Sequence, residues 1–570
     1  MPTPSPAIDC DVLVVGSGAA GLSAAVTAAW HGLKVQVVEK DSVLGGATAW
    51  SGGWMWMPRN PLAQRAGIVE DIEQPRTYLR HSLGERYDAA RVDAFLHNCP
   101  QAVSFFERHT RLQFADGNGI PDIHGDVPGA ATQGHQVIAA PYHAHELGPL
   151  LKRLRRTMRE TSFMGMPIMA GSDLGAFLSM TRSLKAALYV AKRFTRHLYH
   201  LLRYGRAMYL VNGVALVARL AKSAEELGVQ LKTSSPVTRL LIEDGEVRGA
   251  VIATANGEQT VRARAVVLAA GGFPNDSQRR QQLFPRDSSG HDNLALPPLA
   301  CSGDGLRLGE SAGGQVADDL NCAVAWAPVS KVPHGDGSVG HFPHIIDRAK
   351  PGVIGVLASG KRFVNEADGY FDYVAALTAA VPQGEEVASW LICDHPFQRR
   401  YGLGYSRPTP VPVGPLVRSG YLQRANSIDA LARQCGIDPS VLVSTVAEFN
   451  QHARSGQDPQ FGRGNSAYNR KQGDPLHPGS NPCVAPIEQG PFYAVKVQPG
   501  CFGTFAGLRS NAQAQVLNAA GAPIAGLYVA GSDMASIMGG YYPSGGINLG
   551  PALTFGYIAA RHIAGVSDYE

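Results

Sequence analysis

Residues 10–39 read CDVLVVGSGAAGLSAAVTAAWHGLKVQVVE, and this stretch decides the fold. The apolar run Cys10–Val15 predicts a buried strand, the small residues of Leu22–His31 predict a helix, and Lys34–Val38 predicts a second strand. A strand, a helix and a further strand in this order form a βαβ unit with two parallel strands. The sequence therefore predicts an α/β protein.

A glycine motif joins the first predicted strand to the helix. Gly16, Gly18 and Gly21 form the pattern G-x-G-x-x-G. The first glycine allows a tight turn, the second lets the backbone approach a pyrophosphate, and the third lets the helix pack closely on the strand. Ala19 and Ala20 lie within this motif, just before the predicted helix, whose unpaired N-terminal N–H groups attract phosphate. We therefore predict a dinucleotide at this turn.

An acid ends the second predicted strand. From this position the carboxylate of Glu39 can accept hydrogen bonds from both ribose hydroxyls of a nucleotide. It would repel a 2′-phosphate, so NADP is disfavoured. The G-x-G-x-x-G at Gly16–Gly21 lies between a predicted strand and a predicted helix, whereas the second one, GDGSVG at 335–340, precedes no such small-residue helix, so a second domain for NAD(P) is not predicted.

The residues after Glu39 distinguish FAD from NAD. Residues 40–53 read KDSVLGGATAWSGG, which resembles the second cofactor-contacting loop of large FAD-binding flavoproteins. Glycine lets backbone N–H groups reach a cofactor, and hydroxyls can hydrogen-bond phosphate or the flavin edge. The loop has no histidine for the usual covalent linkage, so non-covalent FAD is predicted. The cofactor-binding candidates here are Lys40, Gly45, Gly46, Thr48, Ser51, Gly52 and Gly53.

Distant segments are predicted to reach the same site. Arg264–Phe273 and Gly526–Asp533 each read as a buried strand that runs into glycine. Because a Rossmann-like sheet binds its ligand at the carboxyl ends of its strands, we expect these ends to converge. The further cofactor-binding candidates are Val237, Ala270, Gly271, Gly272, Asp304, Gly531, Asp533, Asn548 and Leu549.

This convergence predicts a discontinuous nucleotide domain. From about residue 299 to about 491 the composition shifts to loops and mixed elements. We predict a Rossmann-like FAD-binding domain at 1–298 and 492–570, with an inserted α+β substrate (catalytic) domain at 299–491.

Composition and charge exclude several other classes of protein. Lys plus Arg number 51 and Asp plus Glu 47, and a net charge of +4 is too small to predict nucleic acid binding. The eight cysteines are scattered with no C-x-x-C, which favours a reducing, cytoplasmic location over a disulfide scaffold. His143 and His145 lack further metal ligands nearby, so no metal site is predicted.

One segment is both basic and amphipathic. No acid occurs between Asp173 and Glu225, and residues 182–206 interleave cations with leucines at roughly helical spacing. Such a helix can make a peripheral contact with an anionic membrane. It can also be an ordinary surface helix whose cations lie over a core. Both interpretations stay open at this point.

Several motifs carry a family resemblance. Gly360–Glu366 reads GKRFVNE, which is similar to the G-K-R-F-x-N-E signature of fumarate-reductase-type flavoproteins. Within that superfamily the chain resembles the 3-ketosteroid dehydrogenases over nearly its whole length. The other segments that carry the resemblance are 302–305 (SGDG), 348–366, 461–464 (FGRG), 489–494 (QGPFYA), 507–509 (GLR) and 542–557 (YPSGGINLGPALTFGY).

The resemblance implies a reaction. In the ketosteroid enzymes a tyrosine O–H and a glycine N–H donate to the substrate carbonyl, and the matching residues here are Tyr542 and Gly546. Such donors stabilise the negative charge that develops on oxygen when the α proton leaves. The implied activity is an FAD-dependent introduction of a double bond α,β to a cyclic ketone, with hydride transfer to flavin N5. An external acceptor such as a quinone, a dye or O₂, rather than NAD, would reoxidise the flavin.

The chain departs from the Δ1 ketosteroid pattern at two places. Ile123 replaces the tyrosine of a Pro-Asp-Tyr segment, and residues 291–369 lack the tyrosine that serves as base. His341 and His344 are candidate bases in that stretch, because imidazole titrates near neutrality. The remaining candidate bases are Tyr370 and Tyr373.

The substrate is left open by these departures. Ser544 matches the Δ4-(5α) ketosteroid enzymes, and both a 3-oxosteroid and a smaller ring such as cyclohexanone fit the resemblance. An alternative is an ene-reductase of fumarate-reductase type, in which Arg348 and His344 would bind a dicarboxylate. A third hypothesis is a flavin-binding electron-transfer subunit without its own substrate.

Overall fold

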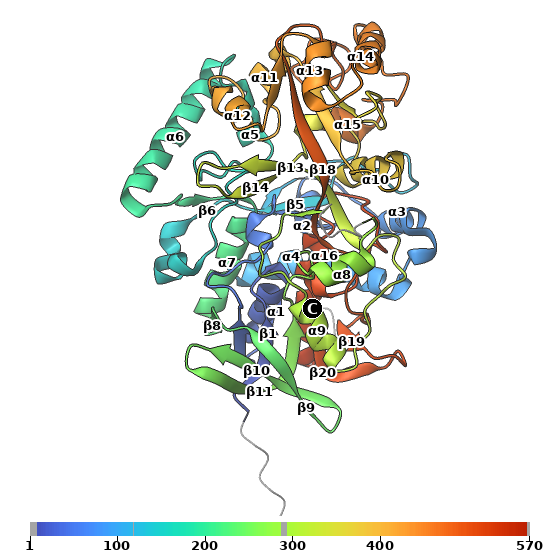
Figure 1. The fold of residues 1–570 in the computed structure, drawn as a ribbon. Coiled ribbons are helices and arrows are strands. Elements are labelled where there is room, and N and C mark those ends of the chain that lie inside the picture. Colours follow the sequence, from blue (N-terminus) through green and yellow to red (C-terminus); the bar gives the residue numbers. More distant parts are fainter. Residues whose placement is uncertain (1–7, 118, 287–292, 567–570) are drawn as a thin grey trace, which may run out of the picture.

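The computed structural model describes residues 8–117, 119–286 and 293–566. Two β-sheets, each with its own helices, lie one above the other in Figure 1. The lower sheet contains the first and the last strands in chain order, and the upper sheet is built from the strands between about residues 294 and 504. This arrangement confirms an α/β class with a discontinuous nucleotide-binding part.

The lower sheet has eight strands, with a core in the order β20-β11-β1-β2-β8. All neighbours along this core pair in parallel, and its central strand β1 is buried on both faces. Parallel sheets need such cover, which explains the continuous apolar run in the sequence. The strands are β1 (Cys10–Val15), β2 (Val35–Val38), β8 (Gln230–Lys232), β9 (Val237–Glu243), β10 (Glu246–Thr254), β11 (Gly257–Leu268), β19 (Gln515–Leu517) and β20 (Pro523–Val529).

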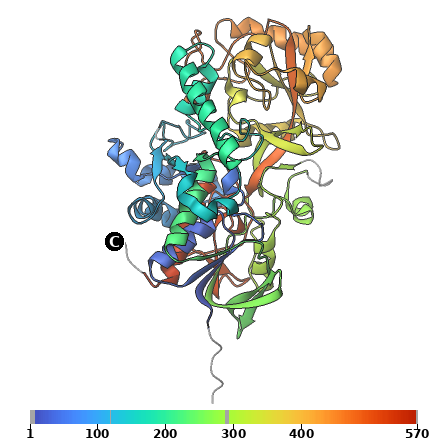
Figure 2. The same ribbon diagram turned by 90° about the vertical axis from the view of Figure 1, so that its left-hand side faces the viewer.

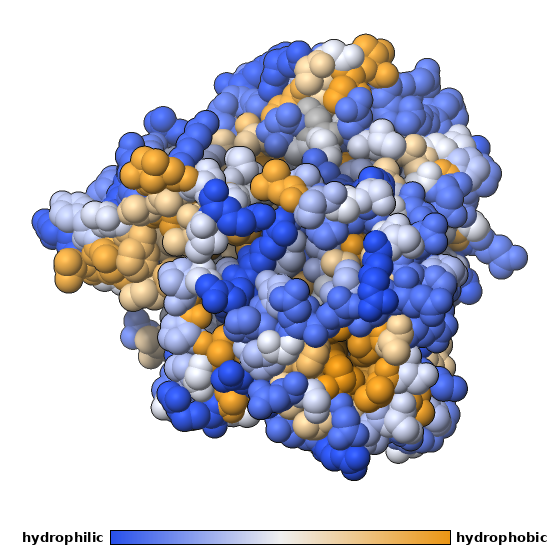
Figure 3. All heavy atoms as spheres, turned by 90° about the horizontal axis from the view of Figure 1, so that it is seen from above, coloured by the Kyte–Doolittle hydropathy of each residue, from blue (hydrophilic) through white to orange (hydrophobic). Residues whose placement is uncertain are grey.

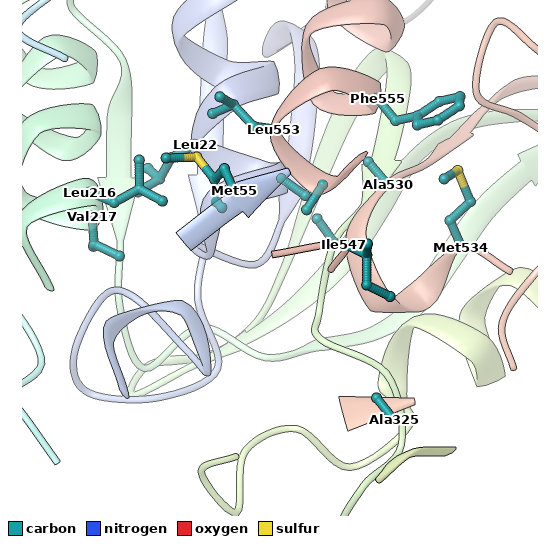
Figure 4. Close-up of a cluster of buried hydrophobic side chains, with 14 of the residues drawn as sticks. Leu22, Met55, Leu216, Val217, Ala325, Ala530, Met534, Ile547, Leu553 and Phe555 are labelled. Atoms are coloured by element: carbon teal, nitrogen blue, oxygen red, sulfur yellow. The ribbon is translucent and has the colours of Figure 1, made fainter. Parts of the chain in front are cut away.

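Three helices pack together on this sheet. They are α1 (Ala19–Trp30), α7 (Asn212–Glu226) and α16 (Leu549–Ile563). Figure 4 shows Leu22, Leu216 and Leu553, one from each helix, in a single cluster of buried side chains. Helix α1 begins at Ala19, earlier than the predicted Leu22, because the last residues of the glycine motif already form its first turn.

The upper sheet has seven strands built around one long strand, β18. β18 pairs with β13 and β16 in antiparallel fashion, and short strands complete its edges. The strands are β12 (Leu294–Ala295), β13 (Val324–Pro333), β14 (Val339–Pro343), β15 (Val353–Val356), β16 (Ser389–Cys393), β17 (Gln423–Ala425) and β18 (Phe492–Thr504). Its helices are α10 (Tyr370–Ala380), α11 (His395–Arg400), α12 (Gly414–Arg418), α13 (Ile428–Cys435), α14 (Pro439–Ala453) and α15 (Ala467–Gln472).

The position of β18 bears on the predicted domain boundaries. β18 begins at Phe492, where the second part of the FAD-binding domain was predicted to start, yet it is central to the upper sheet. β12, which precedes residue 299, also pairs with it. A central strand cannot be separated from its sheet, so we propose that the inserted domain runs from about Leu294 to Thr504.

The remaining elements surround the region between the two sheets. Helices α5 and α6 stand on the outer side of the molecule, beside the upper sheet (Figures 1 and 2). Among the described residues, no helix combines the length and the apolar character that crossing a bilayer requires. These elements are α2 (Pro61–Arg65), α3 (Glu73–Leu83), α4 (Ala89–His109), α5 (Ser172–Ser179), α6 (Leu184–Tyr204), α8 (Ser277–Leu283), α9 (Asp304–Ser311), β3 (Trp54–Trp56), β4 (Phe114–Asp116), β5 (Gln136–Ala139), β6 (Tyr142–His143) and β7 (Tyr209–Leu210).

Close packing at the glycine motif gives a test of the fold. Alanine in place of a helical glycine normally stabilises a helix by about 1 kcal/mol. At Gly21 of α1, however, a Cβ would lie 2.1 Å from the Gly16 carbonyl oxygen. We expect Gly21→Ala to lower the free energy of unfolding by at least about 1–3 kcal/mol, measured by chemical denaturation. Gly175→Ala in α5 is the matched control, because nothing lies within 4 Å of its Cβ. Equal effects of both substitutions would contradict this packing.

Candidate functional site

The two sheets meet at one large cavity. Its volume is about 1270 Å³, which exceeds the about 300–1,000 Å³ typical of a site for one small molecule. It extends from the glycine motif to α5 and α6, so it has room for a cofactor and a substrate together. The predicted cofactor residues that line it are Gly16, Gly18, Ala19, Ala20, Glu39, Lys40, Gly46, Thr48, Ser51, Gly52, Gly53, Val237, Ala270, Gly271, Asp304, Gly531, Asn548 and Leu549.

The glycine turn forms one end of this cavity. Gly16 has a φ of +108°, and a Cβ there would lie 2.2 Å from the Ala269 carbonyl oxygen. Gly18 is the N-cap of α1 and supplies no side-chain cap, so the N-terminus of the helix opens on the cavity. The Ala19 N–H donates to the Thr48 hydroxyl at 3.0 Å, and the positive end of the helix dipole suits a pyrophosphate. The turn therefore fits the phosphates of FAD.

Glu39 lies beside this turn with its carboxylate fixed in place. Its Oε2 accepts hydrogen bonds from the backbone N of Ser17 at 3.1 Å and from the Ser17 hydroxyl at 2.6 Å. Its Oε1 accepts from the backbone N of Asp41 at 2.9 Å. Ser17, which sequence reasoning missed, also accepts from the backbone N of Gly45 at 2.9 Å. Gly45 thus supports the site through Ser17 and does not line the cavity.

Lys40 continues the wall at the nucleotide end. Its ammonium group donates to the Ser302 hydroxyl at 2.7 Å and to Asp304 Oδ2 at 2.8 Å. Both side chains of this ion pair are partly exposed, so the pair adds little stability. The contact ties the loop after β2 to the start of α9, at the edge of the predicted cofactor site.

Two predicted cofactor residues, Asp533 and Gly272, lie behind the cavity wall. The fully buried carboxylate of Asp533 accepts hydrogen bonds from the backbone N of Ala270 and from that of Gly272. Burial raises the pKa of Asp533 to about 6. Asp533 therefore holds the turn after β11, and it is Ala270 and Gly271 of that turn that line the cavity. Gly21, buried under the glycine turn, is likewise absent from the lining.

Tyr542 and Gly546 line the same cavity, as the predicted carbonyl site requires. The Tyr542 hydroxyl accepts a hydrogen bond from Asn548 Nδ2 at 3.3 Å. Burial raises the pKa of Tyr542 to about 12, which keeps its O–H available as a donor. Gly546 has a φ of +89°, and a Cβ there would lie 2.7 Å from the backbone N of Trp56. Helix α16 follows at Leu549, with its N-terminus on the cavity.

Tyr370, the first residue of α10, places a second phenol beside Tyr542. Tyr370 lines the cavity, and its ring centroid lies 4.9 Å from that of Tyr542 in an edge-on contact. Burial and the neighbouring Tyr542 raise the pKa of Tyr370 well above its usual value. Tyr373, the other candidate on α10, lies away from the cavity, with its hydroxyl 2.9 Å from the Ser389 hydroxyl.

The structure does not bring His341, His344 or Ser544 to the cavity lining. Side chains alternate along β14, so Phe342 faces the cavity while the His341 Nδ1 lies 2.7 Å from the Ala295 carbonyl oxygen. His344 is fully buried, with Nδ1 2.7 Å from Asp347 Oδ2 and Nε2 2.9 Å from the Ser330 hydroxyl. Ser544 is also buried and accepts from Gln136 Nε2 at 3.0 Å.

A buried ion network behind Gly546 escaped sequence reasoning. His135 Nε2 lies 2.6 Å from Glu70 Oε1, and its Nδ1 lies 3.0 Å from Asp122 Oδ2. Trp56 Nε1 donates to Asp122 Oδ1 at 2.9 Å, and the Trp56 backbone N donates to the Gly546 carbonyl at 3.1 Å. The two carboxylates raise the pKa of His135 to about 10 against the effect of burial. The network thus fixes β3, the strand that donates the backbone hydrogen bond to Gly546.

Comparison with known proteins identifies the family of this chain. The sequence profile of the FAD binding domain family matches residues 11–549. The chain is 40% identical to 4-oxocyclohex-2-ene-1-carboxylate 5-dehydrogenase of Sinomonas cyclohexanicum, over 98% of this chain and 94% of that protein. It is 34% identical to 3-oxosteroid 1-dehydrogenase of Mycolicibacterium smegmatis, over 97% of each chain.

A solved structure shows the same fold. It is the 3-ketosteroid Δ1-dehydrogenase of Sterolibacterium denitrificans in complex with 1,4-androstadiene-3,17-dione, with a TM-score of 0.90 and 32% identity. The match covers 98% of this chain and 100% of that one. Fold and site together define an FAD-dependent oxidoreductase. The chain belongs to the FAD-dependent 3-ketosteroid dehydrogenase family, which includes desaturases of smaller cyclic ketones. This confirms the resemblance and the cofactor that the sequence indicated.

The ion network around His135 predicts a pH dependence of stability. The folded pKa of about 10 lies above the ordinary 6.5, so this stabilisation is complete below pH 6.5 and is lost as pH rises through 10. Near pH 6.5 we expect His135→Gln to lower the free energy of unfolding by about 3–5 kcal/mol. The difference from wild type should shrink towards pH 10.

Chemical denaturation across this pH range measures the effect. His81→Gln, at an exposed position of α3, is the control and should follow the wild-type profile. A difference between wild type and His135→Gln that stays constant with pH would show that His135 is not charged in the folded protein.

Proposed function

We propose that this protein introduces a carbon–carbon double bond α,β to the carbonyl of a cyclic ketone. The observation that carries the proposal is that Tyr542, Gly546 and Tyr370 line one cavity with the residues that fit FAD. FAD, when bound, supplies the acceptor for the hydride that leaves the β carbon.

Tyr542 and Gly546 bind and polarise the ketone in this proposal. The Tyr542 oxygen accepts the Asn548 amide and also contacts the Tyr370 hydroxyl, and its own O–H is the proposed donor to the carbonyl oxygen. The Gly546 N–H is the second donor. Preorganised donors of this kind are each worth about 3–4 kcal/mol when charge develops on the carbonyl oxygen. They therefore lower the barrier to removal of the α proton.

Tyr370 is the proposed acceptor of the α proton. Of the four candidate bases named from the sequence, it alone is among the described residues that line the cavity. Because its pKa is raised, Tyr370 holds its proton in the resting enzyme. It must lose that proton before it can accept one, and we therefore expect turnover to rise with pH. This role replaces the one predicted for His341 and His344.

The same geometry disfavours the reductase alternative. Arg348, which would bind a dicarboxylate, is buried and donates to the backbone carbonyls of His344, Glu366 and Asp368. Neither Arg348 nor His344 is among the residues that line the cavity. The cation that fumarate-type chemistry needs is thus already bound within the protein.

The substrate that we propose is a 3-oxosteroid or a similarly apolar polycyclic ketone. Beyond Tyr370 and Tyr542 the cavity continues between apolar side chains of α5 and α6 and a loop at 401–411 that contributes Pro408, Pro410 and Val411 as well as polar side chains. The ligand named for the Sterolibacterium denitrificans structure is such a ketone.

A ring ketone that carries a carboxylate is the second candidate. Lys350 is a nearly buried cation on the cavity wall, and it donates to the carbonyl oxygens of Gln472 and Gly473. Burial lowers its pKa to about 8, so it is still mostly charged at neutral pH. The relative at 40% identity is named for an oxocyclohexene carboxylate, which would pair with such a cation.

An external acceptor such as a quinone, a dye or O₂ is proposed to reoxidise the flavin. The G-x-G-x-x-G at Gly16–Gly21 opens a helix, whereas the one at 335–340 lies at the turn between the antiparallel strands β13 and β14, which supports this choice over NAD. A cytoplasmic location is proposed as well, because all eight cysteines are free and seven of them are buried.

Flavin bleaching tests the proposed reaction. We expect anaerobic addition of a 3-oxosteroid to bleach the FAD absorbance, and a dye to restore it. 4-Oxocyclohexanecarboxylate and cyclohexanone, tested in parallel, report on the second candidate. If no ketone bleaches the flavin, while enones or fumarate reoxidise dithionite-reduced enzyme, the reaction runs as a reductase instead.

Removal of single hydroxyls tests the assigned roles. We expect Tyr542→Phe to lower the rate of bleaching by about 10²–10³-fold, because it removes one carbonyl donor. Tyr370→Phe should lower it by about 10²–10⁴-fold, because it removes the proton acceptor. Both variants should retain FAD, as judged by their absorbance spectra.

Tyr373→Phe is the matched control. It also removes a tyrosine hydroxyl from α10, but at a position that does not line the cavity. It should bleach at nearly the wild-type rate. If Tyr370→Phe bleaches at the wild-type rate while His341→Gln bleaches much more slowly, His341 and not Tyr370 is the base.

A further inference from the structure

The outer side of α6 exposes an apolar stripe. Leu184, Leu188, Tyr199 and Leu202 are 77%, 64%, 58% and 90% exposed, respectively. Their spacing of four, eleven and three residues places all four on one side of a helix. Figure 3 shows hydrophobic side chains gathered on the left-hand projection of the molecule, where α6 lies in Figure 1. Contiguous exposed apolar surface of this kind marks an interaction site.

A row of cations runs beside this stripe. Lys185, Lys192, Arg196 and Arg203 are exposed, and their spacing of seven, four and seven residues places them on an adjacent strip of the same helix. Every charged residue of α6 is basic. Among the described residues, Lys185, Lys192 and Arg203 form no ion pair. The outer side of α6 therefore carries net positive charge next to its apolar stripe.

The inner side of α6 belongs to the cavity. Ala187, Val190, Ala191 and Phe194 line it. The helix is preformed, because the Ser183 side chain caps its N-terminus and Gly205 ends it in the left-handed conformation. α6 is thus a wall with the cavity on one side and the exposed apolar stripe on the other.

We propose that the outer side of α6 docks on the surface of an anionic lipid bilayer. Apolar side chains that enter the interface, bordered by cations that reach lipid headgroups, are the pattern of a helix that lies in the membrane plane. A second copy of this chain is a poorer occupant, because two such helices in contact would bring cations against cations. Anionic lipid supplies the opposite charge.

Docking would place the cavity wall at the membrane surface. A ketone dissolved in lipid, or a quinone that reoxidises the flavin, would then have a short path to the cavity. This consequence rests on the proposed function, whereas docking of α6 does not. A test of lipid binding is therefore independent of the reaction.

Vesicle flotation of the holoenzyme tests the proposal. We expect the protein to float with vesicles of phosphatidylcholine and phosphatidylglycerol, but not with phosphatidylcholine alone. High salt should weaken binding, because it screens the cations. The double variant Lys192→Gln, Arg203→Gln should bind about 25-fold more weakly, at about five-fold for each cation removed. Leu188→Ser, Leu202→Ser should bind at least about ten-fold more weakly.

Matched substitutions elsewhere serve as controls. Val69→Ser, at a position that is 92% exposed, and Arg239→Gln, whose side chain is 62% exposed, should float like wild type. The flavin spectrum and the melting temperature show whether each variant is folded. Three outcomes would overturn the proposal: no flotation, equal flotation with neutral vesicles, or a dimer in sedimentation that the leucine variant dissolves.

Discussion

Close approach of backbone to backbone is the constraint on which the rest of this structure depends. At Gly16, Gly546 and Gly550 an added Cβ would meet a main-chain atom at 2.2, 2.7 and 2.2 Å, respectively. These three contacts join β1 to β11, and the C-terminal segment to β3. Gly16 and Gly546 line the cavity, and Gly550 lies behind them, so the backbone itself forms part of the surface that a cofactor meets. Side chains at these places would hold the elements apart and leave no site.

Buried polar groups in that wall and behind it hold the backbone in position. Ser17 and Glu39 fix the loop after β2, Asp533 fixes the turn after β11, and His135 fixes β3 through Trp56 and Asp122. Buried polar groups are costly unless they are paired, so each of these contacts is closely satisfied. At the glycine turn and beside Gly546 the residues that face the cavity are therefore small, while the carboxylates of Asp533 and Asp122 lie one layer behind them.

The end of the cavity far from the glycine turn is lined by side chains rather than by backbone. There the apolar side chains of α5 and α6 border the cavity, and the same α6 presents leucines and cations to the outside. One helix thus serves two surfaces, and its sequence reflects both. The sequence pattern of residues 182–206 was compatible both with membrane contact and with an ordinary surface helix. A sequence does not show which leucines are exposed and which are buried. Burial separates them: Leu188 is exposed, whereas Val190 is not.

The sequence by itself determined the parallel sheet, the glycine turn, the cofactor and the family, because these depend on local spacing and on motifs that lie close together in the chain. Most predicted cofactor residues line the cavity for the same reason. Only the tertiary structure decided the rest. It placed Tyr370 against Tyr542 and turned His341 away, since the direction of a side chain depends on the register of a strand and on where distant helices begin. It also put β18 in the upper sheet, because strand pairing is a long-range contact that local spacing does not encode.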